Sequence, residues 1–182
     1  MTALLHLPSQ RVVLAVTLAA LVATVAFAFV FDGLHRPLAP YTIVDLEFAG
    51  APARLAEMTE AWGAAGLAAA RQSLWLDFLF MPAYALLFAG LALMVARATS
   101  GLAQTLGLWL SLMPFAAWAW DLLENVMLLS ALPPALAAET ALRVAAIAAG
   151  VKFGVLGLAG LYIIVGGAWG LIRGRVRRVV NA

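Results

Sequence analysis

Four long runs of apolar residues alternate with shorter polar segments along the chain. The apolar runs cover residues 12–31, 74–96, 106–132 and 144–172. At a rise of about 1.5 Å per residue, a helix of about 20 residues crosses the roughly 30 Å hydrocarbon core of a bilayer. Each run is long enough, so the pattern predicts four transmembrane helices. The expected fold is an all-α, integral membrane four-helix bundle that forms a single membrane domain over residues 1–182.

Residues 32–73 form the one long hydrophilic connection, which prolines and glycines divide. We expect two short helices here, one near residues 41–49 and a second that opens at Pro52. The second helix would carry an apolar stripe at helical spacing, formed by Leu55, Met58 and Trp62. The two helices together predict a short helical extracytoplasmic cap. The spacing does not require Asp45 or Glu47 to point toward the spans.

The first apolar run, residues 12–31, has two interpretations. Arg11 and the small-x-small sequence Ala26-Phe27-Ala28 would also suit a cleaved signal peptide. The run is long for the apolar part of a signal peptide and continues through Phe31. This length favours a span that is retained.

Basic residues near the span ends predict the orientation. With four spans both termini share one side, and the positive-inside rule places the more basic side in the cytoplasm. The terminal side would hold Arg11, Arg97, Arg173, Arg175, Arg177 and Arg178, against Arg36, Arg54, Arg71 and Arg143 on the other side. We therefore expect a multi-pass protein of a bacterial inner membrane with both termini in the cytoplasm.

Composition agrees with membrane insertion and argues against several kinds of site. Of the 182 residues, 65% are hydrophobic and 11% are charged, which is more apolar surface than a soluble domain of this size can bury. There is no cysteine, and both histidines, His6 and His35, lie outside the predicted spans. We therefore expect no cofactor, no metal site and, at a net charge of only +2, no nucleic-acid binding.

Polar residues interrupt the third run between Trp118 and Asn125. Asp121, Glu124 and Asn125 are spaced i, i+3 and i+4, so they project from one face of a helix. A charged residue at the centre of a membrane helix costs about 2.5–3.5 kcal/mol to insert. These side chains therefore need a partner in a neighbouring helix.

Depth along the helices identifies that partner. Counted from the extracytoplasmic ends, Asp77 lies about 5 Å deep, Glu124 about 10 Å, Asp121 about 15 Å and Lys152 about 13 Å. Lys152 is the only lysine of the chain. Because the four residues share one leaflet, we expect Lys152 to form an ion pair with Asp121 or Glu124 between the third and fourth spans.

The acids outnumber the one base, which makes the cluster a candidate functional site. The expected ligand-binding residues are Asp77, Tyr84, Trp118, Asp121, Glu124, Asn125 and Lys152. In a catalytic role, Asp121 or Glu124 would be the general acid or base, and Lys152 would stabilise negative charge. The alternative is purely structural: Lys152 ties two helices together, Asn125 forms a hydrogen bond across the interface, and nothing is bound.

Glycine is frequent in the last run, where Gly150-x-x-x-Gly154 and Gly166-x-x-x-Gly170 occur. This spacing permits close approach of two helices. We expect the close packing within the chain, and a homo-oligomer is the alternative.

Several of these segments together resemble a group of small bacterial four-span membrane proteins with no assigned activity. The segments are residues 42–48 (Thr-Ile-Val-Asp-Leu-Glu-Phe), Leu76-Asp77-Phe78 with Tyr84, Asp121-x-x-Glu124-Asn125, and Lys152. In topology and buried acids the chain is also similar to the emopamil-binding, sterol-isomerase-like membrane domain. That similarity implies a lipophilic ligand pocket, although the histidine and proline-rich opening of the isomerase are not evident here.

Three classes of function follow. The first is a non-enzymatic membrane protein that binds a membrane lipid, another lipophilic molecule or a membrane-protein partner at the outer-leaflet polar cluster. The second is an intramembrane acid/base enzyme of the isomerase kind. The third is a subunit of a proton-coupled transporter. The small size of the chain favours the first class over a stand-alone carrier.

Overall fold

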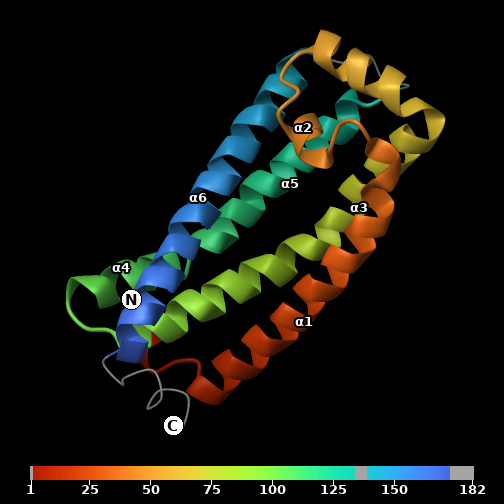
Figure 1. Cartoon of the computed structure of the whole chain (residues 1–182). Coiled ribbons are helices and arrows are strands. Elements are labelled where there is room, and N and C mark those ends of the chain that lie inside the picture. The colour runs from red at the N-terminus through yellow and green to blue at the C-terminus, as the bar shows by residue number, and fades with distance from the viewer. Residues whose placement is uncertain (1, 134–138, 173–182) are drawn as a thin grey trace. The chain divides into compact units, whose positions relative to one another are not determined.

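The computed structural model describes residues 2–133 and 139–172, and this part of the chain is predominantly helical. Helices make up 88% of it, and no strand occurs in the described ranges. The elements are η1 (Thr2–Leu5), α1 (Gln10–His35), η2 (Arg36–Leu38), α2 (Ile43–Glu47), α3 (Pro52–Ala98), α4 (Leu102–Leu110), α5 (Met113–Ala131) and α6 (Glu139–Ile172), as Figure 1 shows. The predicted all-α fold is confirmed.

Four helical stretches are long and apolar enough to cross a membrane. They are Gln10–Leu38, Pro52–Ala98, Leu102–Ala131 and Glu139–Gly170. Each overlaps one of the predicted spans, so the four long apolar helices are confirmed. Most of them extend past the predicted bounds, because helical backbone hydrogen bonds continue into the polar flanks.

A second helix opens at Pro52, as predicted, and a kink at Gly63 separates it from the helix of the predicted second span. The two helices follow each other without a loop, so together they form the 47-residue element α3. A kink at Gly63 takes the place of the expected connection, and the backbone there has φ 59° and ψ −163°. Glycine adopts such angles at little cost because it has no Cβ. α3 also continues through Pro82.

The third predicted span is interrupted. α4 ends at Leu110 and α5 begins at Met113. Pro114 explains the interruption, because it has no backbone N–H to donate to the preceding turn and disfavours helical geometry in the residue before it. In the first turn of α5 that missing N–H is tolerated, since no partner is needed there. The Ser111 hydroxyl donates to the Leu108 carbonyl at 2.8 Å, which satisfies the end of α4.

The chain divides into two compact units, and every long helix contributes a segment to both. The first unit comprises Met1–Thr24, Ala83–Trp118 and Phe153–Ala182; the second comprises Val25–Pro82 and Ala119–Lys152. The single membrane domain stays a prediction.

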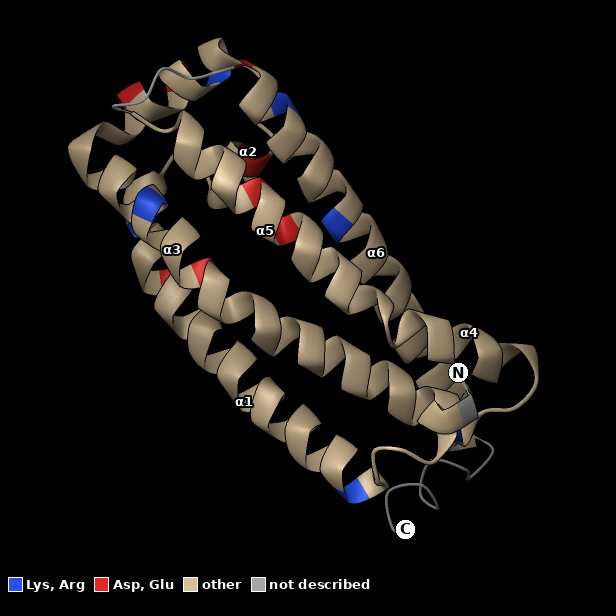
Figure 2. Ribbon diagram, turned by 180° about the vertical axis from the view of Figure 1, so that it is seen from behind, with Lys and Arg blue, Asp and Glu red and all other residues tan. Residues whose placement is uncertain are grey.

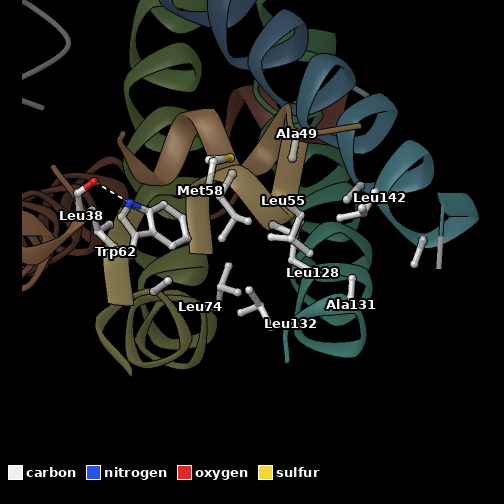
Figure 3. Packing of buried hydrophobic residues seen from close by; sticks show 14 of the residues in the cluster. Leu38, Ala49, Leu55, Met58, Trp62, Leu74, Leu128, Ala131, Leu132 and Leu142 are labelled. Carbon is white, nitrogen blue, oxygen red and sulfur yellow. Dashed lines mark hydrogen bonds between the residues drawn. The ribbon is translucent and has the colours of Figure 1, made fainter. Parts of the chain in front are cut away.

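The second unit has an apolar core between α2, α3, α5 and the start of α6 (Figure 3). The predicted stripe of Leu55, Met58 and Trp62 is buried in this core. The Trp62 indole N–H donates to the carbonyl of Leu38, which joins α3 to the segment after α1. Gly66 allows this close contact, because a Cβ there would lie 2.8 Å from the Pro37 carbonyl oxygen.

The first unit has a smaller apolar core and a basic side chain that holds the N-terminal segment. The core contains Val13, Leu93, Ala96 and Leu108. The Arg97 guanidinium, near the end of α3, donates to the carbonyls of Leu4 and Pro8 at 2.8–3.1 Å and to the Gln10 side-chain oxygen at 2.9 Å. These bonds fix η1 against α3.

The glycines of α6 differ in their surroundings. A Cβ at Gly166 would lie 2.7 Å from a methyl group of Val95, so this glycine does allow close packing within the chain. At Gly150 and Gly154, apart from the adjoining backbone of α6 itself, no atom of the described structure lies within 4 Å of the position that a Cβ would take. The expected close packing within the chain therefore holds at Gly166 and not at these two positions.

The kink at Gly63 gives a direct test of the fold. Gly63→Ala would place a Cβ on a backbone that is almost exclusive to glycine, and we expect it to lower stability by about 1–3 kcal/mol. Thermal unfolding in detergent measures the effect. Gly33→Ala in α1 is the control, since its φ is not positive and nothing lies within 4 Å of the new Cβ. If Gly63→Ala and Gly33→Ala changed stability equally, the backbone at the kink would tolerate a side chain, and the prediction would be wrong.

Candidate functional site

The ammonium of Lys152 lies at the centre of a group of carboxyl groups in the second unit. Lys152 is on α6 and is 5% exposed. Three carboxyl groups lie within 4 Å of its Nζ, two from α5 and one from α2. Figure 2 shows acidic positions on α5 opposite a basic position on α6. We call Lys152, Glu47, Asp77, Asp121, Glu124 and Asn125 the charge cluster.

Two of these carboxyl groups project from one face of α5, as their spacing predicted. Lys152 Nζ donates to Asp121 Oδ1 and to Glu124 Oε1, each at 3.0 Å. Glu124 Oε2 lies 2.9 Å from the same nitrogen but accepts no well-aligned hydrogen bond. Asp121 is 2% exposed and Glu124 is 0% exposed. The structure therefore contains the predicted ion pair, with both acids sharing one base.

Glu47 is the third carboxyl group, and sequence reasoning did not place it in the site. Its Oε1 lies 3.4 Å from Lys152 Nζ, and its side chain is 12% exposed. Its Oε2 is buried without a hydrogen-bond partner among the described residues. The sequence carries no signal for this position, because five residues of helix are too few for a periodicity to show which face is buried.

The position of α2 is set by a capping box at its N-terminus, by one buried leucine and by the turn that follows it. The side chain of Thr42 accepts a hydrogen bond from the Asp45 backbone N–H at 3.2 Å, and Asp45 Oδ2 accepts one from the Thr42 N–H at 2.8 Å. This reciprocal capping box satisfies the first N–H groups of a very short helix. Leu46 is fully buried, so its packing draws α2 toward the core. Gly50, with φ +64°, then turns the chain toward α3.

A second polar contact joins α5 to α3. The Asn125 amide donates to Asp77 Oδ2 at 2.8 Å and to the Leu74 carbonyl at 3.2 Å. Asn125 therefore forms a hydrogen bond across a helix interface, as the structural alternative expected, but its partner helix is α3 and not the fourth span. One turn before Asp77 on the same helix, the Ser73 hydroxyl lies 2.8 Å from His35 Nε2. A second pair of polar side chains, His35 and Ser73, thus lies one helical turn from Asp77 along α3.

Five of the seven predicted site residues belong to one unit of the structure, and two belong to the other. Asp77, Asp121, Glu124, Asn125 and Lys152 all belong to the second unit. Tyr84 and Trp118 belong to the first unit, so they are not part of the cluster described. The ligand-binding role assigned to all seven, and the catalytic role assigned to Asp121, Glu124 and Lys152, stay predictions.

Electrostatics defines what the cluster can do. It contains four carboxyl groups and one ammonium, so full ionisation would leave three negative charges uncompensated. Burial raises the pKa of Glu47, the neighbouring Lys152 ammonium opposes this shift, and Asp121 adds to it. Isolated charges in such surroundings are strongly disfavoured. Such a cluster can bind protons.

The described residues do not form a metal centre. No group of three or more histidine, cysteine or carboxylate residues in these ranges is arranged to hold a metal ion. The reason is visible in the cluster, since the ammonium of Lys152 occupies the position between the carboxyl groups that a cation would take.

Comparison with protein-family models, with curated proteins and with solved structures finds no match for this chain. The resemblances to small bacterial four-span proteins and to the sterol-isomerase-like domain therefore stay predictions.

A double-mutant cycle tests whether the ion pair stabilises the fold. Lys152→Met leaves buried carboxylates without their base, and we expect it to lower stability by about 3–5 kcal/mol at neutral pH. Combining it with Glu124→Gln or Asp121→Asn should recover part of that loss, as thermal unfolding in detergent would show.

The matched control for this cycle is Arg143→Met, which removes an exposed ion pair with Glu139 on the same helix. An exposed pair contributes at most about 1 kcal/mol. If Lys152→Met proved as mild as Arg143→Met, the cluster would contribute nothing to stability.

The raised pKa of Glu47 predicts a pH dependence. A carboxyl group whose pKa is higher in the folded state favours folding while it is protonated, and this contribution is lost as the pH rises through the folded pKa. We therefore expect the Tm of the wild type, relative to that of Glu47→Gln, to fall as the pH increases above about 4. A relative Tm that rises with pH would mean that the attraction of Lys152 outweighs burial.

Proposed function

We propose that the chain is a multi-pass protein of a bacterial inner membrane, with both termini in the cytoplasm, and that its charge cluster takes up and releases protons. This is the proton-coupled class among the three that the sequence suggested. One observation carries the proposal: three buried carboxyl groups share one ammonium, and a fourth, that of Asp77, is held beside them by Asn125. Intramembrane groups of this kind occur in the proton relays of pumps and transporters.

Enclosure supports proton exchange over ligand binding at the same place. Asp121, Glu124 and Lys152 are each at most 5% exposed. A lipid headgroup or an enzyme substrate would need room beside these groups, whereas a proton needs only a path of polar side chains. The contacts of His35 with Ser73 and of Asp77 with Asn125 mark the polar side chains nearest to such a path.

Charge balance supports the same conclusion. At an effective dielectric constant of about 20, two like charges 4 Å apart repel by about 4 kcal/mol. Glu47 and Glu124 both approach the same nitrogen, at 3.4 Å and 2.9 Å, so two ionised carboxylates beside Asp121 would strongly repel each other. Retaining protons among them relieves that repulsion. The titration then belongs to the group as a whole and not to one residue.

Infrared spectroscopy of the protein in lipid nanodiscs tests the proposal directly. We expect the absorption of a protonated carboxyl group at neutral pH, which disappears as the pH is raised. Glu124→Gln should reduce or shift this signal, because it removes one carboxyl group of the cluster. Glu60→Gln is the matched control, since Glu60 is exposed on α3 outside the cluster.

Two outcomes would contradict proton exchange at the cluster. One is a spectrum in which every carboxyl group is ionised at neutral pH. The other is a protonated signal that Glu124→Gln and Asp77→Asn both leave unchanged while the variants remain folded.

A further inference from the structure

The first unit contains a partly open apolar groove with a volume of about 200 Å³. Segments of α1, α3 and the junction between α4 and α5 line it. Its floor is buried and includes Val13, Ala89 and Leu93, whereas Val16 and Leu86 on its rim are 40% and 38% exposed. Floor and rim are both apolar, so the groove suits hydrocarbon surroundings and not water.

The hydroxyl groups in the lining are turned away from an occupant. Thr17 Oγ1 donates to the Val13 carbonyl at 2.7 Å, and Ser111 Oγ donates to the Leu108 carbonyl at 2.8 Å. Both donors are therefore used within their own helical turns. An occupant of the groove therefore contacts hydrocarbon surfaces and finds no free hydroxyl donor along the groove.

Close contact of two helices limits the depth of the groove. A Cβ at Gly90 of α3 would lie 2.0 Å from Thr17 Oγ1 of α1, so the backbone of α3 touches α1 at this point. The break between α4 and α5 at Ser111–Leu112 supplies the third wall. The groove is therefore formed by close helix packing and by a helix break. It is more than the gap that separates neighbouring side chains on any lipid-facing helix.

The size of the groove selects the kind of occupant. An apolar cavity of about 150 Å³ suffices to bind benzene. The groove, at about 200 Å³, is somewhat larger and is open at one side, so it takes a segment of extended hydrocarbon. It is too small to receive a helix, whose diameter with side chains is about 10–12 Å.

We propose that this groove binds one acyl chain of a membrane phospholipid. The site lies in a different unit from the charge cluster, and the proposal goes beyond proton exchange and does not depend on it. Lipid binding was expected from the sequence at the polar cluster; the structure favours a purely apolar location for it.

The N-terminal end of the groove offers a place for the polar part of the lipid. Leu4 and Pro8 line this end, and their carbonyls accept hydrogen bonds from Arg97. Polar groups therefore gather beside this end of the groove, which is where the ester and headgroup of the lipid would lie.

Photocrosslinking tests the acyl-chain site. The protein is reconstituted into phosphatidylethanolamine and phosphatidylglycerol vesicles that contain a phosphatidylcholine with a diazirine in one acyl chain. After illumination, mass spectrometry maps the adducts. We expect them to concentrate several-fold on Val16, Leu86 and Phe115 over Leu18 and Val22, which are exposed on α1 outside the groove.

Substitutions at the rim distinguish specific binding of a lipid in the groove from nonspecific contact with the surrounding lipid. Val16→Phe and Leu86→Phe extend from the exposed rim into the groove and should lower the groove adducts several-fold with little change in Tm. Leu18→Phe is the matched control on the same helix and should leave them unchanged. The carboxyl infrared signal should be the same in all three, so a failure here is distinguishable from a failure of the proton proposal.

The acyl-chain proposal is overturned by either of two results. Adducts spread evenly over the exposed apolar residues, and unaffected by Val16→Phe, would mean ordinary lipid contact. Crosslinks between two copies of the chain at the groove, in place of lipid adducts, would assign this surface to a second copy.

Discussion

The need to keep one buried ammonium paired determines the arrangement of the second unit. Lys152 is buried, and three carboxyl groups from α5 and α2 lie 2.9–3.4 Å from its nitrogen. Meeting that requirement brings α6 beside α5 and holds the short helix α2 against them. An apolar core of leucine, alanine, methionine and tryptophan then packs around the same elements. Buried charge and apolar packing thus specify one arrangement of helices.

That arrangement also creates an imbalance. A structural tie between two helices needs one acid and one base, whereas this cluster has four acids for one base. Replacing a buried ion pair with apolar residues is often neutral or stabilising, so excess buried acids are weak evidence for stability alone. Proton binding gives the excess a physical role. The first unit, by contrast, presents a groove whose polar atoms are satisfied internally, and hydrocarbon is the natural occupant of such a surface.

Much of the fold could be predicted from the sequence, because apolar runs of membrane length have few alternatives to helix. The ion pair was also predictable, since Lys152 is the only lysine and helical rise places it at the depth of Asp121 and Glu124. The kink at Gly63 was not predictable, because a glycine between two helical patterns is equally compatible with the end of a helix and with a bend in it. The break before Pro114 was likewise hidden within a continuous apolar run.

The sequence by itself determined the four apolar helices, their order, and the face of α5 that carries the acids, because helical periodicity and chain length act locally. Only the tertiary structure decided that Glu47 completes the cluster, that Asn125 binds Asp77, and that Tyr84 and Trp118 belong to the other unit. The groove beside Gly90 is also a tertiary feature. These features depend on which helix faces meet, and that is decided by packing and charge pairing between residues far apart in the chain.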